Sequence, residues 1–191
     1  MNNVEHATAY ATEAHAGQVR KYVNEPYAEH PKRVAARVAL VPGMSEAAVI
    51  AALLHDVVED TDRTLAEIES LYGPEVALLV DALTDKYTPE SHPDLNRKAR
   101  KALEAVRLAT IPHAAKVIKM ADIVDNLVGT DPADPFSAVW LKEKDALLLG
   151  IGAADSALRH EIEVAATKLQ VASDAALAAK KAAKAAAKAA P

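Results

Sequence analysis

The fold is decided by one stretch, Ala51-Ala52-Leu53-Leu54-His55-Asp56-Val57-Val58-Glu59-Asp60-Thr61, in which an apolar helical pattern ends in four ionisable side chains. On a helix, His55 and Glu59 lie four residues apart, as do Asp56 and Asp60, so we expect two adjacent stripes along one side. The run before them, 49–54, is too apolar for a solvated surface. We therefore expect His55 and Asp56 at the floor of a cleft.

Acidic side chains at the floor of a cleft need a partner. A buried, unpaired carboxylate is unfavourable, and the usual remedies are an ion pair, protonation or a metal ion. The neighbouring residues 57–62 add acid but no lysine or arginine. A divalent cation is therefore a simple way to hold His55 beside several carboxylates. The alternative is a histidine at a helix end that pairs only with its neighbouring aspartate.

Composition indicates packed helices. The chain has 191 residues, which is enough for one domain with a hydrophobic core. Hydrophobic residues make up 51% of it, yet there is one Phe and one Trp, and Ala, Leu and Val dominate. This balance favours helices over sheets. The sequence therefore predicts an all-α fold, a single-domain helical bundle.

Charge and cysteine content restrict the partners. The net charge of −5 gives no overall attraction for nucleic acid or an anionic membrane, so a polyanionic ligand must be held by local cations or a metal. The absence of cysteine excludes disulfides and thiolate metal sites and fits a reducing cytoplasm. Residues 1–17 lack the apolar core of a signal peptide, and no run reaches membrane-spanning length. We expect a cytoplasmic protein without a membrane partner, and its oligomeric state stays open.

Prolines, glycines and capping residues divide the chain into helical segments. We expect Asp94 to cap the helix that carries the basic residues 97–101, and Trp140 to lie in the core. Residues 84–93 read as a polar connection between helices. The expected helices cover about 3–16, 31–40, 45–61, 62–71, 75–83, 115–121, 136–149 and 155–177, with a further long helix that begins at 94 and has 96–101 in its first half.

The C-terminal segment 178–191 consists of alanine and lysine with a final proline. Alanine and lysine favour helix locally, but no side chain larger than Ala is available for docking, so we expect this segment to be frayed or disordered. We accordingly divide the chain into a domain of residues 1–177 and a low-complexity tail of residues 178–191. A solvated tail is favoured over weak binding of nucleic acid, which is otherwise not an expected partner.

Three motifs, taken together, resemble one enzyme family. They are Tyr27-Ala28-Glu29-His30-Pro31, the stretch 55–61, and Lys119-Met120-Ala121-Asp122 with Asn126. Asp122 interrupts an apolar pattern, so it either faces outward or is buried with a partner. The ordered set His, His-Asp, Asp resembles the metal-binding signature of the HD superfamily of metal-dependent phosphohydrolases. The resemblance implies an all-helical domain of the HD type and four metal ligands: His30, His55, Asp56 and Asp122.

Within that superfamily, the chain most resembles the alarmone hydrolases, the RelA/SpoT-type hydrolase domain and its stand-alone small forms. The similarity covers about residues 8–127 and includes the motifs 15–18, 20–21 and 26–27. It implies a manganese-dependent enzyme that removes the 3′-pyrophosphate of guanosine tetra- or pentaphosphate, giving GDP and pyrophosphate from the tetraphosphate. Glu59 and Asp60 match the pair that activates water. The implied substrate-binding residues are Arg20, Lys21, Tyr27, Arg97, Lys98 and Asn126.

The chain also departs from the family pattern near its third motif. The family commonly carries an arginine, a ring residue and another arginine where this chain has Ile123, Asp125 and Val128. The substrate therefore stays open, with another nucleotide or NADPH as the alternative. A non-catalytic nucleotide sensor is a further alternative, against which the intact Glu59 and Asp60 argue. Two imidazoles with two carboxylates suit manganese, iron or zinc better than calcium.

Overall fold

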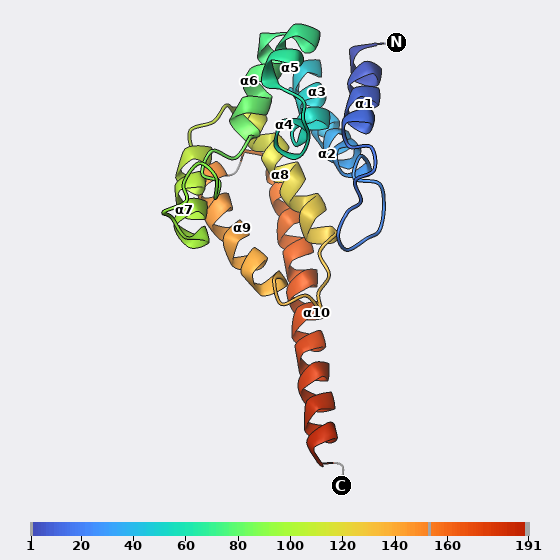
Figure 1. The fold of residues 1–191 in the computed structure, drawn as a ribbon, viewed down its shortest axis with the longest axis vertical. Coiled ribbons are helices and arrows are strands. Elements are labelled where there is room, and N and C mark those ends of the chain that lie inside the picture. Colours follow the sequence, from blue (N-terminus) through green and yellow to red (C-terminus); the bar gives the residue numbers. More distant parts are fainter. Residues whose placement is uncertain (1, 153, 190–191) are drawn as a thin grey trace.

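The computed structural model describes residues 2–152 and 154–189 (Figure 1). Within these residues the regular elements are helices, and the only strand-like pairing is an isolated bridge between Val19 and Pro26. The all-α prediction is confirmed. None of the described helices combines the length and the apolar character that a membrane span requires. In chain order, the helices are α1 (Asn3–Ala14), α2 (Glu29–Leu40), α3 (Glu46–Leu54), α4 (Val57–Asp60), α5 (Leu65–Tyr72), α6 (Pro74–Leu83), α7 (Arg97–Leu108), α8 (His113–Val128), α9 (Ser137–Ile151) and α10 (Ser156–Ala189).

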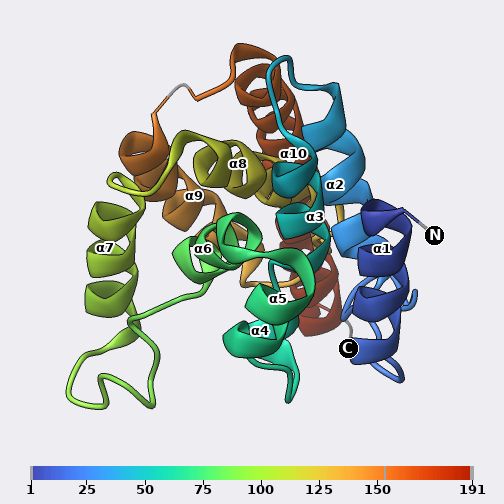
Figure 2. The same cartoon turned by 90° about the horizontal axis from the view of Figure 1, so that it is seen from above.

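Helix α8 lies at the centre of the bundle. It contacts α2, α3, α6, α9 and α10, and Figure 2 shows these helices arranged around it. The apolar pattern of α8 explains this position, because Val117, Ile118, Met120 and Ala121 are all fully buried. A helix that is apolar on most sides is stable only when it is surrounded by other helices. Two acidic side chains of α8, Asp122 and Asp125, are buried in this position.

The helix predicted through Thr61 is interrupted at the His-Asp pair. Helix α3 ends at Leu54, and α4 begins only at Val57, so His55 and Asp56 form the junction between them. The Nδ1–H of His55 donates to the Ala52 carbonyl at 2.9 Å. This carbonyl is the acceptor that the Asp56 amide would use in a continuous helix. The expectation of two stripes along one helix is wrong, and the junction presents both side chains instead.

Helix α7 begins at a different cap from the one predicted. The Asn96 side chain, not Asp94, accepts a hydrogen bond from the Ala99 amide and caps the helix. Both residue types are good N-caps, so composition alone does not choose between them. By contrast, α5 begins close to the start predicted at residues 62–64, where Thr64 and Glu67 form a reciprocal capping box.

Helix α10 extends well beyond the body of the domain (Figure 1). Its first half packs on α8 and α9 through buried Leu158, Ile162 and Leu169, whereas the side chains of 177–188 are exposed. The expectation of a frayed or disordered tail is therefore wrong for residues 178–189, which are helical. A docked helix needs no new nucleus to continue through strong helix formers. Residues 190–191 lie outside the described residues, and the domain boundary at 177 stays a prediction.

Because residues 178–188 expose their side chains, deleting 178–191 should leave the melting temperature nearly unchanged. Differential scanning calorimetry on the full and truncated chains measures this. Leu169→Ala in the docked half serves as the matched comparison, because loss of a buried leucine costs about 2–5 kcal/mol. A drop of several degrees after the deletion would show that the tail packs against the domain.

Candidate metal centre and adjoining cavity

The structure brings the four predicted metal ligands together from three elements. His30 comes from the first turn of α2, His55 and Asp56 from the α3–α4 junction, and Asp122 from α8. The Nε2 atom of His30 lies 3.4 Å from Asp56 Oδ2 and 3.3 Å from Asp122 Oδ1. The Nε2 atom of His55 lies 3.2 Å from Asp56 Oδ1 and 3.8 Å from Asp122 Oδ1. Among the described residues, His30, His55 and Asp56 form a group with ligand-like spacing.

The protonation of His55 indicates that this cluster suits a cation. The Ala52 carbonyl can only accept a hydrogen bond, so Nδ1 of His55 carries the proton. In the neutral ring, Nε2 then presents a lone pair toward two carboxylates. This buried atom finds no hydrogen-bond partner among the described residues. An unpaired nitrogen lone pair facing anions is unfavourable unless a positive ion lies between them, so the residues fit a divalent metal.

The pKa values around the cluster also indicate that it suits a cation. Burial lowers the pKa of His30, but hydrogen bonds with Asp122, Asp125 and Asp56 outweigh it and raise the pKa to about 11. Burial raises the pKa of Asp56, but the charge of His55 and the hydrogen bond with His30 hold it well below its usual range. The cluster thus retains protons when no cation is present. A metal must displace these protons, so its binding should weaken as the pH falls.

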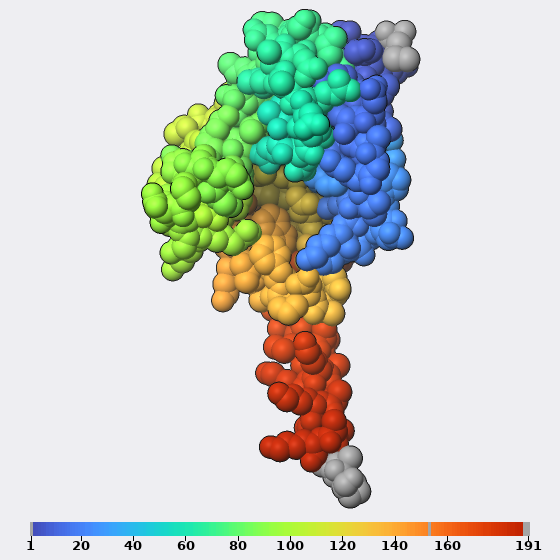
Figure 3. All heavy atoms as spheres, viewed as in Figure 1, coloured from blue at the N-terminus to red at the C-terminus, as the bar shows by residue number. Residues whose placement is uncertain are grey.

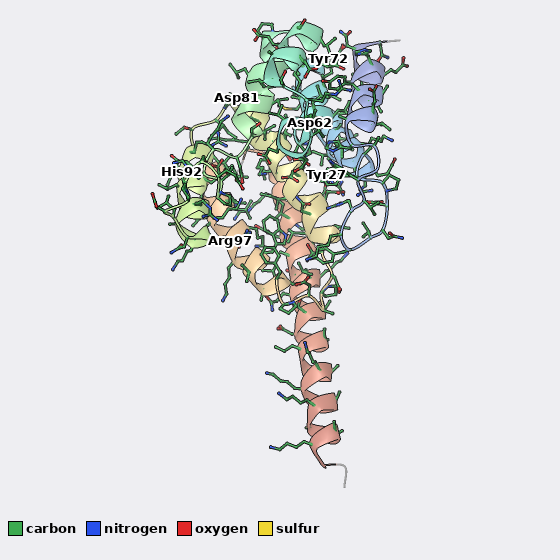
Figure 4. All side chains as sticks on the ribbon, viewed as in Figure 1. Tyr27, Asp62, Tyr72, Asp81, His92 and Arg97 are labelled. Carbon is green, nitrogen blue, oxygen red and sulfur yellow. The ribbon has the colours of Figure 1, made fainter. Side chains whose placement is uncertain are left out.

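Each carboxylate of the cluster is held in place by a further residue. Tyr27 donates its hydroxyl hydrogen to Asp56 Oδ2 at 2.7 Å. Lys119 donates to Asp122 Oδ2 at 2.9 Å, and Asn126 donates to Asp122 Oδ1 at 2.5 Å. Such outer contacts fix the direction of metal ligands. Tyr27, predicted to bind substrate and labelled in Figure 4, therefore lies against a predicted metal ligand.

Asp125 is part of this site, although sequence reasoning noted it only as a departure from the family pattern. It lies one turn after Asp122 on α8 and is 2% exposed. Its carboxylate accepts hydrogen bonds from His30 Nδ1 at 2.8 Å, Arg20 at 2.6 Å and Arg33 at 2.7 Å. The available signal was its spacing of three residues from Asp122 in an apolar helix, which places both acids on one face.

The predicted catalytic pair lies on α4. The Asp85 backbone amide donates to Glu59, and the loss of hydration in the cleft raises the pKa of Glu59 to about 7, against the lowering effect of that amide. Burial and then the charge of Asp56 also raise the pKa of Asp60. Gln18 donates to the Asp60 carbonyl at 2.7 Å, which ties this end of α4 to the loop after α1. A carboxyl group with a pKa near 7 can both take up and release a proton at neutral pH.

Beside the cluster lies a cavity of about 1020 Å³ between α7, α8, α9 and the segment 20–22. Figure 3 shows a hollow bordered by α4, the green α7 region and the blue N-terminal loop, with yellow and orange residues at its floor. Trp140, predicted in the core, is only half-buried and lines this cavity. A wide indole can cover apolar neighbours with one face and present the other to a ligand. The lining also includes Phe136 and the predicted residues Arg20, Lys21, Arg97, Lys98 and Asn126.

The cavity carries a local positive charge in a chain whose net charge is −5. Lys101, one of the basic residues 97–101, joins Lys98 in its wall, together with Lys142, which the sequence did not single out. Arg97 makes two hydrogen bonds of 2.9 Å with Glu143, and Lys21 lies 3.3 Å from Asp134. A concave surface lined by lysines raises the local concentration of anionic ligands.

Asn126 joins the cavity to the cluster. Its side chain lines the cavity and donates to Asp122, while its Oδ1 accepts from Arg20 at 2.8 Å. Figure 4 labels Tyr27 and Arg97 on opposite sides of this region. A ligand with one end at the His-Asp cluster can therefore extend its other end toward the lysines of α7 and α9.

Known proteins resemble this chain over the same region. Residues 7–134 match the family model described as HD domain. The chain is 39% identical over 137 residues to guanosine-3′,5′-bis(diphosphate) 3′-pyrophosphohydrolase MESH1 of Drosophila melanogaster, covering 71% of this chain and 72% of that protein. It is 36% identical over 128 residues to guanosine-3′,5′-bis(diphosphate) 3′-pyrophosphohydrolase of Aquifex aeolicus, covering 65% of this chain and 17% of that protein.

A solved structure is similar over almost its full length. It is described as a metazoan ortholog of SpoT that hydrolyzes ppGpp, with a TM-score of 0.75, 28% sequence identity, and coverage of 88% of this chain and 96% of that one. The matched family region contains all four predicted ligands, His30, His55, Asp56 and Asp122. The family-model match, the helical fold and the His-Asp cluster of this chain all indicate the same family. The chain belongs to the HD domain family.

Proposed function

We propose that the chain is a manganese-dependent guanosine-3′,5′-bis(diphosphate) 3′-pyrophosphohydrolase. The observation that carries this proposal is the opening of the His-Asp cluster, through Asn126, onto a cavity lined by lysines. The names of the relatives from Drosophila melanogaster and Aquifex aeolicus support the same substrate. We also propose a cytoplasmic location, because a chain without cysteine fits a reducing compartment.

The cavity suits a nucleotide that carries phosphate at both ends. Guanosine tetraphosphate bears one diphosphate at its ribose 3′ oxygen and another at its 5′ oxygen. With the 3′ group at the cluster, the 5′ group reaches toward Lys98, Lys101 and Lys142 in the cavity wall. The volume of about 1020 Å³ lies at the upper end of the usual range of about 300–1,000 Å³ for ligand pockets. Phe136 and Trp140 offer aromatic faces for the base.

The reaction adds water at the phosphorus bonded to the ribose 3′ oxygen. The bond from this phosphorus to the 3′ oxygen breaks, the oxygen takes up a proton to become a hydroxyl group, and pyrophosphate leaves. Glu59 accepts the proton of the attacking water, for which its pKa near 7 is suited, and Asp60 orients that water. A bound divalent metal supplies neutralisation of negative charge on the phosphoryl group.

The chemistry of the donors suits manganese, as it suits iron or zinc. The predicted shell contains two imidazole nitrogens from His30 and His55 and carboxylate oxygens from Asp56 and Asp122. Calcium prefers an all-oxygen shell, and soft metals prefer thiolates, which this chain lacks. Four protein ligands leave room for phosphate oxygens in an octahedral shell.

A product assay tests the proposal. Manganese-loaded protein incubated with guanosine tetraphosphate should release GDP and pyrophosphate in equal amounts, measured by anion-exchange chromatography and a pyrophosphatase-coupled assay. The coupled assay with and without pyrophosphatase separates pyrophosphate from orthophosphate. Direct release of orthophosphate, or turnover only with NADPH or simple mononucleotides, would contradict the proposal and favour another substrate for the same site.

A further inference from the structure

One buried carboxylate, that of Asp125, receives hydrogen bonds from four side chains in two different parts of the chain. His30, Arg33 and Arg37 reach it from α2, and Arg20 reaches it from the loop after α1. The separations along the sequence are 88 to 106 residues for these contacts and the adjoining Arg20–Asn126 bond. Asp125 therefore fixes elements that the backbone connects only distantly.

The contact with His30 sets the direction of a predicted metal ligand. The same carboxylate accepts from the guanidinium groups of Arg20 at 2.6 Å and Arg33 at 2.7 Å, and two adjoining cations favour its ionised form. An ionised carboxylate only accepts, so Nδ1 of His30 must carry a proton. When His30 is otherwise neutral, Nε2 then holds the lone pair and points at Asp56 and Asp122. A carboxylate behind a ligating histidine also makes the imidazole a stronger donor.

The contact with Arg20 sets one wall of the cavity. Arg20 donates to Asp125 Oδ2 at 2.6 Å and to Asn126 Oδ1 at 2.8 Å, and its side chain is 11% exposed. A Cβ atom added at Gly129 would lie 3.2 Å from both terminal guanidinium nitrogens of Arg20. The absence of a side chain at 129 thus leaves the space that Arg20 occupies. The Arg20 guanidinium donates to two acceptors and lies close to Gly129. It therefore has little freedom to move toward a ligand.

Arg33 completes the arrangement from the other side. It donates hydrogen bonds to Asp125 through Nε at 2.7 Å and Nη2 at 3.1 Å, and it also donates to Glu25 through Nη1 at 3.0 Å. Glu25 lies in the same loop as Arg20, whose amide donates to the Glu25 carbonyl at 3.0 Å. Arg20 and Glu25 therefore tie the loop after α1 to one hydrogen-bond network, and Asp125 is at the centre of that network.

We infer that Asp125 is a positioning residue that serves two parts of the site with one carboxylate. It holds His30 so that Nε2 faces the metal position, and it holds Arg20 at the cavity wall. This residue stands where the resemblance leads one to expect a ring side chain, so the arrangement is a property of this chain. The part concerning Arg20 rests on the proposed function, whereas the part concerning His30 needs only a metal.

Manganese titration of the metal-free full chain by isothermal calorimetry tests the first part. Asp125→Ala should weaken manganese binding by about 10–100-fold, the usual effect of removing an outer partner of a ligating histidine. Asp125→Asn should weaken it less, because its amide oxygen can still accept from His30 Nδ1. Parental manganese affinity in either folded variant overturns the proposal, and the Asn variant alone decides if the Ala variant does not fold.

Arg33→Gln provides the matched control for a purely structural role. It removes two hydrogen bonds from the same carboxylate but leaves the His30 contact in place. Urea denaturation of the metal-free proteins should show both Asp125→Ala and Arg33→Gln to be less stable than the parent. Only Asp125→Ala should lose manganese affinity. Equal loss of affinity in both variants would assign Asp125 a structural role alone and overturn the proposal.

Gly129→Ala tests the second part, because it displaces Arg20 without touching His30. This variant should raise KM for guanosine tetraphosphate and keep parental manganese affinity, whereas Asp125→Ala should change both. An unchanged KM in Gly129→Ala would overturn the role assigned to Arg20. Graded manganese affinities without any hydrolysis of guanosine tetraphosphate would refute the proposed substrate and leave the positioning of His30 standing.

Discussion

His55→Ala should remove bound metal and hydrolysis together. His55 is buried, and its Nε2 lone pair faces two carboxylates. Alanine therefore removes one predicted metal ligand and leaves a void beside these carboxylates. Asp122→Ala should have the same effect, because Asp122 Oδ1 lies within 4 Å of the Nε2 atoms of both His30 and His55. Since activity depends on the metal, we expect turnover to fall to background in both variants.

Elemental analysis and turnover on the same preparations measure this result. Treatment of the parent with a chelator should abolish hydrolysis, and added manganese should restore it. The control is His160→Ala, because His160 is an exposed histidine on α10, away from the cluster. Undiminished metal in both His55→Ala and Asp122→Ala would show that the ion is bound elsewhere.

The residues themselves predicted only part of the cluster, and the resemblance to the HD superfamily supplied the set of four. His55 and Asp56 are adjacent, they follow an apolar run, and Asp122 interrupts a second apolar run. The residues alone left Asp122 either facing outward or buried with a partner. The order of the motifs, which resembles the HD signature, is what joined His30 and Asp122 to the His55-Asp56 pair. The all-α fold followed from the same apolar periodicity.

Other features depended on contacts that the sequence does not show. The break at His55 arises from a side chain that takes its own helix's carbonyl, and helical spacing predicted a continuous helix instead. The partners of Arg20 lie 105 and 106 residues away, so its role as a clamped side chain appears only when α8 packs beside the loop. The helical tail was not predicted, because residues 178–189 have no side chain that could dock. They are helical because they continue a helix that is already formed.

Glu59→Gln should separate binding from chemistry. Gln keeps the shape of Glu but cannot take a proton, and Glu59 lies on α4, where it accepts from the Asp85 amide and is not one of the four predicted ligands. Manganese content and nucleotide affinity should therefore survive, while turnover falls by about 10²–10⁴, the range for loss of a positioned general base. The exposed Glu69→Gln on α5 is the matched control and should keep parental turnover.

The pH profile gives an independent test of this role. A base works only when deprotonated, so parental turnover should rise with pH up to the pKa of Glu59, about 7 in the absence of a cation and lower beside a bound one. Glu59→Gln should lose this rising limb. Asp60→Asn should also lower turnover, and the double variant should lose less than the product of the two effects, because both residues act on one step. Parental turnover in Glu59→Gln would show that Glu59 is not the base and would leave Asp60 as the candidate.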